Sequence, residues 1–164
     1  MAIAAGLTLV NVYTSLVDVP AWSHNIPASV DTTRQYYQVS NPGDFFRIFS
    51  PLNQLLGLLC LVLFWKRSRQ VRLLLAAAFA LYVTGEGMTF MYFYPRNAIL
   101  LGTQPADAST LQSVLAEWSS MNWVRSLVVA AGCVCSGLAL HNTYATSPKN
   151  MVTRKREVLM GEPV

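Results

Sequence analysis

Residues 73–95 read LLLAAAFALYVTGEGMTFMYFYP, an apolar run whose only charged side chain, Glu86, stands between two glycines. As an α-helix this run is roughly 35 Å long, enough to cross the ~30 Å hydrocarbon core of a bilayer. A helix on the surface of a soluble domain would carry charge along its solvent face, and this run does not. The chain of 164 residues has room for one domain, and the sequence predicts that this domain lies in a membrane.

Two further apolar runs precede this one. Residues 2–19 are followed by Pro20, which we expect to end the helix, and they lack the basic start and the small-residue cleavage site of a secretory signal. Residues 45–65 form the second run, which is interrupted by Arg47 and Pro51. Both runs are predicted to be transmembrane helices.

The fourth run, residues 118–142, is predicted to belong to a longer helix. Asp107 and Ser109 are both suitable N-caps, so the helix can project from the membrane before crossing it. The predicted fold is therefore all-α, a bundle of four transmembrane helices that occupies residues 1–145. Residues 146–164 are predicted to be a polar, basic, cytoplasmic tail.

A loop rich in proline, serine, asparagine and aromatic residues connects the first two predicted helices. Within it, residues 29–39 are expected to form a short interfacial helix. Trp22, Tyr36 and Tyr37 suit the headgroup level of a bilayer, where amphipathic rings collect.

Positive charge predicts the orientation of the bundle. With four spans, the turn after the second and the tail after the fourth lie on one side of the membrane. These two segments hold eight of the twelve lysines and arginines: Lys66, Arg67, Arg69, Arg72, Lys149, Arg154, Lys155 and Arg156. Cytoplasmic loops carry such an excess, so both termini are predicted to be cytoplasmic. The clusters adjoin apolar runs and suit lipid headgroups, which we expect as partners in place of nucleic acid.

The cysteines and methionines do not indicate a metal site. Three cysteines cannot form a disulfide framework, and all three lie inside apolar runs. Cys133 and Cys135, two residues apart, point to nearly opposite faces of a helix and suit a chelate poorly. Met88 and Met91 have no histidine in their span, so core packing is favoured over copper binding.

Polar side chains follow one stripe on each predicted helix, at spacings of three and four residues. The stripes comprise Asn11, Thr14, Ser15 and Asp18; Arg47, Ser50, Asn53, Gln54 and Gly57; Tyr82, Glu86, Thr89 and Phe93; and Trp118, Asn122 and Arg125. All four lie in the predicted outer half, so we expect them to meet in one polar pocket. There, Arg47, Arg96 and Arg125 would balance Asp18 and Glu86.

A structural explanation competes with this pocket. Interhelical polar contacts are common in membranes, and Asn11, Thr14, Ser15 and Asn53 could serve only to hold helices together. Asp18 and Arg125 could extend to the interface. Glu86 is too deep for that, and an ionisable group in hydrocarbon costs at least ~2.5–3.5 kcal/mol, which favours a function.

Four short patterns resemble the anthrone oxygenase family of small membrane proteins, most of which are uncharacterised. They are Asp18-Val19-Pro20, Pro51-Leu52-Asn53, Pro95-Arg96-Asn97 and, the most specific, Trp118-x-x-x-Asn122-x-x-Arg125. The resemblance covers about residues 5–142. It implies an oxygenase that converts an anthrone to an anthraquinone with molecular oxygen and with no metal or flavin cofactor.

Such a reaction needs a base, a group that holds an oxyanion, and a dry pocket for a flat ring system. Glu86 or Asp18 is the expected base, and Asn122 with Arg125 would hold the oxyanion. The residues expected to contact substrate are Asn53, Tyr82, Phe93, Trp118 and Trp123. These roles follow from position and chemistry and are not transferred from the family.

Two other functions stay open at this level. The first is a non-enzymatic membrane protein that binds a lipid or a quinone, or that serves as an accessory subunit. The second is a transporter or channel, which is less favoured because four short helices leave little room for alternating access and no inverted repeat is visible. The sequence leaves open whether the chain forms homo-oligomers.

Overall fold

The computed structural model describes residues 1–103 and 106–145, and all of its regular structure in these two ranges is helical. The predicted tail, residues 146–164, lies outside the described residues. The elements are α1 (Ala2–Tyr13), η1 (Thr14–Asp18), α2 (Val19–Ser23), α3 (Ala28–Tyr36), α4 (Pro42–Leu63), α5 (Arg69–Met88), η2 (Thr89–Phe93), α6 (Tyr94–Leu100) and α7 (Ala108–Ala145). The two η elements are π-helical turns.

Four continuous helical rods result, and each is long and apolar enough to cross a membrane. They span Ala2–Ser23, Pro42–Leu63, Arg69–Leu100 and Ala108–Ala145. The four-helix transmembrane fold predicted from the sequence is thereby confirmed. The cytoplasmic placement of the termini stays a prediction.

The structure differs from the expected helix ends at two prolines. Pro20 and Pro95 were expected to mark ends, yet the first rod continues to Ser23 and the third to Leu100. Each proline sits in the first turn of a helix that directly follows a π-helical turn. A proline ring normally clashes with the carbonyl four residues before it, and the wider π turn changes the position of that carbonyl.

Side-chain caps begin two of the long helices, α4 and α7. Asn41, within a segment expected to be a loop, accepts a hydrogen bond from the Gly43 amide and forms a capping box with Asp44 at the start of α4. Asp107 accepts from the Thr110 amide at 2.7 Å, which confirms one of the two caps predicted for α7. Hydrogen bonds from the Ser109 hydroxyl and from Thr110 lower the pKa of Asp107 to about 2, so this cap is ionised at neutral pH.

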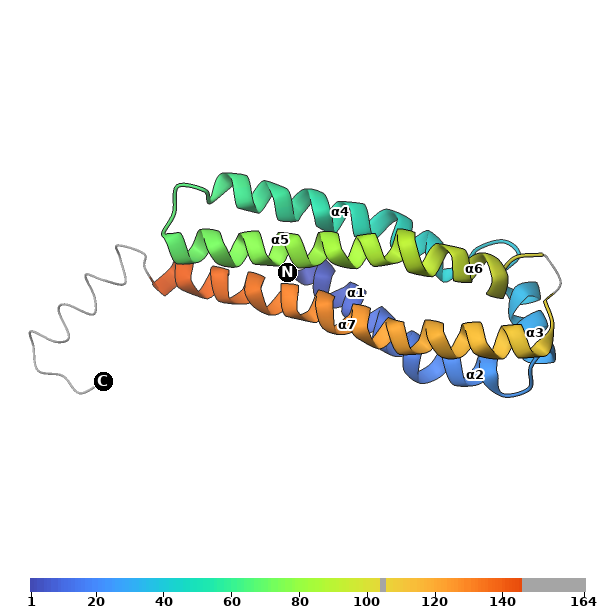
Figure 1. The fold of residues 1–164 in the computed structure, drawn as a ribbon. Helices are drawn as coiled ribbons and strands as arrows, with labels where there is room; N and C mark the ends of the chain where they lie inside the picture. The colour runs from blue at the N-terminus through green and yellow to red at the C-terminus, as the bar shows by residue number, and fades with distance from the viewer. Residues whose placement is uncertain (104–105, 146–164) are drawn as a thin grey trace, which may run out of the picture.

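The two ends of the bundle differ (Figure 1). We call the end that carries α2, α3, α6 and the start of α7 the cap end, and the end at the α4–α5 turn, residues 64–68, the hairpin end. The cap end has its own apolar core of Val19, Trp22, Val30, Phe93, Leu100, Leu111, Leu115 and Trp118. Arg34 of α3 donates to the carbonyls of Ile99 and Leu100, which fixes α3 on the end of α6.

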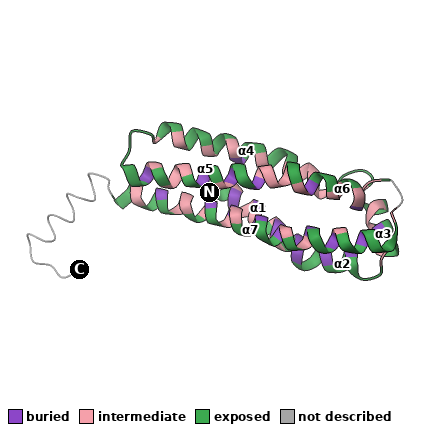
Figure 2. Cartoon of the chain, in the orientation of Figure 1, coloured by how far each residue is buried: buried purple, intermediate pink, exposed green. Residues whose placement is uncertain are grey.

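The long rods present apolar side chains to their surroundings. Asn53 is the only buried residue of α4, and this helix is almost free of buried positions in Figure 2. At 38 residues, α7 is roughly 57 Å long, well above the bilayer core thickness, so it is long enough both to cross a membrane and to project from it. α5 packs most extensively on α7, and these two helices carry most of the site described below.

One glycine allows α5 and α7 to approach each other. A Cβ at Gly132 would lie 2.6 Å from Cε1 of Tyr82, whose ring is buried between the helices. At Gly87, by contrast, a Cβ would meet nothing within 4 Å.

We expect Gly132→Ala to lower the free energy of unfolding by about 1–3 kcal/mol, because the buried Tyr82 ring must shift. Gly87→Ala is the matched control and should be neutral or slightly stabilising, since alanine favours a helix. Thermal unfolding of both variants in the same detergent tests this expectation. Equal midpoints for the two variants would contradict the close packing of Tyr82.

Candidate functional site

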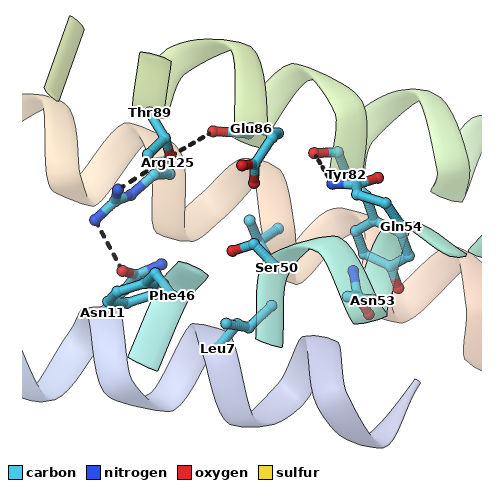
Figure 3. Close-up of a pocket in the computed structure, with 12 residues that line it drawn as sticks. Leu7, Asn11, Phe46, Ser50, Asn53, Gln54, Tyr82, Glu86, Thr89 and Arg125 are labelled. Atoms are coloured by element: carbon cyan, nitrogen blue, oxygen red, sulfur yellow. Dashed lines mark hydrogen bonds between the residues drawn. The ribbon is translucent and has the colours of Figure 1, made fainter. Parts of the chain in front are cut away.

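A buried arginine on α7 organises the site. The Arg125 side chain is only 7% exposed. Its Nη2 donates to Oδ1 of Asn122 at 2.6 Å and to Oδ1 of Asn11 at 2.9 Å, and its Nη1 reaches Oγ1 of Thr89 at 3.4 Å. Three helical rods, the first, third and fourth, thus hold one guanidinium group (Figure 3).

The partners of Arg125 are neutral. Within residues 1–103 and 106–145, no carboxylate oxygen lies within 4.0 Å of its nitrogens. Aromatic rings supply the rest of its environment: the guanidinium carbon lies 3.9 Å from the Phe93 ring centroid and 5.3 Å from that of Phe46. A buried cation without a paired anion is costly, which makes Arg125 a candidate functional residue.

Asn122 positions this arginine. Its side chain is fully buried, and its Nδ2 donates to the Asn11 carbonyl at 2.9 Å and to the Ser15 hydroxyl at 2.7 Å. With both amide protons used in this way, Oδ1 is oriented toward Arg125. Asn122 therefore acts through Arg125 and does not line the cavity beside it.

Glu86 shares a cavity with Arg125. This small cavity, about 20 Å³, is lined by both residues together with Asn11, Phe46, Ser50, Asn53, Gln54, Tyr82 and Thr89. Figure 3 shows the Glu86 carboxylate extending toward Ser50 of α4. A second cavity of about 60 Å³ continues toward the cap end and has Phe46, Ser50, Glu86, Thr89 and Arg125 in common with the first. We call the two together the polar cavity.

Two buried polar atoms at the polar cavity have no hydrogen-bond partner in the described part of the chain. They are Nε of Arg125 and Oε1 of Gln54. Gln54 uses its other amide atom, Nε2, to donate to the Tyr82 carbonyl at 2.8 Å. Buried polar atoms are nearly always paired, so these two indicate a place where water or a ligand completes the bonding.

Both π-helical turns lie at this level of the bundle. Thr14–Asp18 follows Asn11, and Thr89–Phe93 contains both Thr89 and Phe93 of the Arg125 environment. Single π turns inside α-helices occur frequently at functional sites, because they turn side chains away from the regular face. Two of the three rods that hold Arg125 contain such a turn, which supports the interpretation of this region as a functional site.

The structure brings most of the predicted site residues together. Asn53, Tyr82, Glu86, Trp118 and Arg125 line the polar cavity. Asn122 and Phe93 lie behind Arg125 and contact its guanidinium group. Trp118 also donates from Nε1 to Oδ1 of Asn97 at 2.8 Å, which joins two of the four sequence patterns noted above.

Two predicted residues do not reach the polar cavity. Asp18 is absent from the lining of the polar cavity. It is the last residue of the π turn Thr14–Asp18, in which each residue rotates about the helix axis by less than in an α-helix, so Asp18 no longer lies on the Asn11 stripe. Trp123 is 41% exposed and also absent from the lining. It follows Asn122, which faces the bundle interior, so about 100° of helical rotation turns Trp123 outward.

The expected charge balance is wrong for Arg47 and Arg96, whereas Arg125 does share a cavity with Glu86. Arg47 pairs with Asp44 at 2.9 Å, and Arg96 pairs with Glu117 at 2.6 Å. Neither arginine forms an ion pair with Asp18 or Glu86 in the described residues. Asp44 and Glu117 bind these two arginines in place of Asp18 and Glu86, because each of these pairs forms near the cap end without burying a charge.

Some site residues carried little or no signal in the sequence. Ser50, Gln54, Asn11 and Thr89 lie on the polar stripes, so their place in the pocket was expected, but no chemical role was assigned to them. Phe46 lines both parts of the polar cavity and stacks near Arg125. A phenylalanine in an apolar run has no pattern that distinguishes it from a lipid-facing one.

The comparison with known families gives one match. The family model described as anthrone oxygenase matches residues 45–135, more than half of the chain. The matched segment includes Glu86, Asn122 and Arg125 and excludes α1 with Asn11 and η1 with Asp18. No curated protein and no solved structure matches the chain.

Proposed function

The chain belongs to the anthrone oxygenase family, and on that premise we propose that it oxidises an anthrone-like phenol with molecular oxygen inside the membrane. The observation that carries the proposal is the buried Arg125 cation, which lacks a paired carboxylate and shares the polar cavity with Glu86. A base and an oxyanion-binding group side by side suit removal of an acidic C–H proton.

The first step is proton transfer. An anthrone has a methylene carbon opposite its ring carbonyl, and loss of one methylene proton gives an aromatic enolate. Glu86 accepts this proton in the proposal. The negative charge moves to the carbonyl oxygen, where the Arg125 guanidinium stabilises it through its free Nε–H.

The second step is the reaction with oxygen. The enolate transfers one electron to O₂, and the resulting carbon radical and superoxide combine to form a C–O bond. The proton held by Glu86 then returns to the peroxide, which gives a neutral hydroperoxide at the former methylene carbon. The carboxylate is restored, and O₂ has been reduced by two electrons.

The third step forms the quinone. Removal of the remaining proton at that carbon forms the new C=O bond as the O–O bond breaks and hydroxide leaves. Hydroxide takes up this proton and departs as water. One anthrone and one O₂ thus give one anthraquinone and one H₂O, and the enzyme returns to its starting protonation state.

The size of the polar cavity suits small reactants. Volumes of about 20 and 60 Å³ accommodate water or O₂, whereas drug-sized ligand sites are about 300–1,000 Å³. The polar cavity therefore receives the reacting edge of the substrate, and the apolar rings need a further space. Phe46 and Phe93 shield the guanidinium from bulk water, which strengthens its interaction with an enolate.

Oxygen uptake tests the proposal directly. Purified full-length protein in detergent should consume O₂ on addition of anthrone, with one anthraquinone formed per O₂. When isotopically labelled O₂ is supplied, one labelled oxygen should enter each quinone. Anthrone also oxidises spontaneously, so protein-free micelles and heat-unfolded protein are the controls. A rate equal to that of the micelles would refute the proposed function.

A further inference from the structure

A larger apolar cavity lies next to the polar one, toward the hairpin end. Its volume is about 360 Å³, within the range typical of ligand pockets. Residues 1–3, before and at the start of α1, form one wall, and α4, α5 and α7 form the others. We call it the apolar chamber. The N-terminus lies part-way along α7 in Figure 1, and the Cys133 thiol lies 3.8 Å from the Met1 carbonyl oxygen.

The apolar chamber and the polar cavity share two lining residues, Asn53 and Tyr82. The two spaces are therefore separated by no more than these side chains. The Tyr82 hydroxyl is hydrogen-bonded to the Ser136 hydroxyl at 2.9 Å, and its backbone carbonyl accepts from Gln54. Tyr82 is thus held from two sides, whereas Asn53 is not.

Asn53 is the residue that indicates a ligand. Asn53 is only 4% exposed, and its amide group has no hydrogen-bond partner among the residues that the structure describes; unlike Nε of Arg125 and Oε1 of Gln54, the amide faces the two cavities that Asn53 lines. An amide that faces a cavity takes its hydrogen bonds from water or from a ligand in that cavity. Asn53 is also the single buried position on α4, so packing against neighbouring helices does not by itself explain an amide there.

The lining of the apolar chamber defines the chemistry of its occupant. Polar groups gather at the shared end, where Asn53, Tyr82 and Ser136 lie, with Thr143 the other polar residue in the lining. The Thr143 hydroxyl is already committed to the Ala139 carbonyl. The remaining walls are aliphatic and aromatic and include Phe64 and Phe79. This distribution suits flat apolar rings with an oxygen at one edge, and an acyl chain offers Asn53 no partner.

From this geometry we infer that the apolar chamber binds the ring system of a flat polycyclic ketone or phenol, with a ring oxygen hydrogen-bonded to Asn53. The inference rests on the proposed function and adds where the rings lie. Leu56 and Cys60 form part of the α4 wall and are also exposed on the surface of the bundle. An apolar molecule dissolved in the bilayer therefore meets this wall without crossing water.

Two tryptophan variants on α4 test the chamber. Cys60→Trp places a large ring in the chamber, and Leu59→Trp adds the same ring at a position that is 50% exposed and lines no described cavity. Binding of 1,8-dihydroxyanthraquinone, a product analogue, is measured as the quinone retained by immobilised full-length protein. We expect Cys60→Trp to weaken binding at least about tenfold and Leu59→Trp to leave it unchanged. Equal binding by the two variants, with equal thermal midpoints, would overturn the inference.

Asn53→Leu tests the hydrogen bond while it keeps the branched shape and the number of heavy atoms of the side chain. Loss of one neutral hydrogen bond should weaken quinone binding about fivefold. If a short-chain phosphatidylcholine displaces the quinone from wild-type protein and Asn53→Leu has no effect, the chamber is a lipid site and the inference is wrong.

Binding and turnover separate the two proposals. In one outcome the wild-type protein binds quinone, Cys60→Trp does not, and the wild-type protein consumes no O₂ with anthrone. This outcome would support the chamber and refute the proposed function. Normal anthrone turnover by Cys60→Trp would support the proposed function and overturn the chamber as the place of the rings.

Discussion

Replacing Arg125 with methionine is expected to lower kcat about 100- to 1,000-fold, the effect typical of losing one oxyanion-binding group. In the proposal the guanidinium stabilises the enolate oxygen, and methionine keeps the length of the side chain without its charge or its N–H donors. Initial rates of quinone formation in detergent measure the change. KM should change less than kcat, because the charge on the oxygen develops only as the proton leaves.

The stability of this variant is measured together with its activity. Removal of Arg125 leaves Oδ1 of Asn11 and of Asn122 without their donor, but it also removes a buried charge that has no carboxylate within 4.0 Å in residues 1–103 and 106–145. The two unpaired acceptors lower the stability and the lost buried charge raises it, so the thermal midpoint is measured beside the rate. A fall in activity at an unchanged thermal midpoint therefore reports on chemistry.

Two further arginine variants sharpen this test. Arg125→Lys keeps the charge but not the planar fork of donors, so an intermediate rate is expected. Arg72→Met is the matched control, because Arg72 also lies over an aromatic ring, that of Trp65, but lines no described cavity. Full activity of Arg125→Met would exclude the guanidinium from catalysis.

Glu86→Gln is expected to lower kcat by about 100- to 10,000-fold, the range for loss of a positioned general base. Glutamine preserves shape and most contacts with the cavity wall but does not accept the methylene proton. Substrate deuterated at the methylene carbon should react more slowly with wild-type protein when proton removal limits the rate. Rapid-quench or initial-rate measurements of quinone formation give both quantities.

Asp18 and Glu117 provide the comparison for Glu86. Asp18 was the alternative base from the sequence, but it does not line the polar cavity, so Asp18→Asn should retain turnover. Glu117→Gln removes an exposed carboxylate that pairs with Arg96 away from the polar cavity and should do the same. Loss of activity in Asp18→Asn with normal activity in Glu86→Gln would assign the base to Asp18.

Much of the fold was predictable because it depends on local properties. Length and apolarity of residues 73–95 identify a membrane-crossing helix without knowledge of its neighbours. The same reasoning gives four helices, and the family resemblance stated from short patterns is confirmed by the match to residues 45–135. The rods extend beyond the expected ends at Pro20 and Pro95, because a π turn before each proline lets the helix continue.

The candidate site was predictable only in part. Facing on a regular helix follows from spacing, so the meeting of Glu86, Arg125, Asn53 and Tyr82 was expected from the stripes. Asp18 does not lie on the predicted stripe because π turns do not follow α-helical spacing, and no pattern in the sequence predicted this π turn. Phe46 was not foreseen because an aromatic side chain in hydrocarbon suits lipid and protein equally well.

The amino-acid sequence alone determined that this chain forms a four-helix membrane bundle with ionisable groups inside it, since hydrophobic length and buried charge are properties of each segment. Only the tertiary structure decided that Arg125 is held by neutral oxygens and two aromatic rings, and that an apolar chamber with an unpaired Asn53 adjoins the polar cavity. The rotation of each helix about its axis depends on how the helices pack, as at Gly132 against Tyr82, and packing involves residues far apart in the chain.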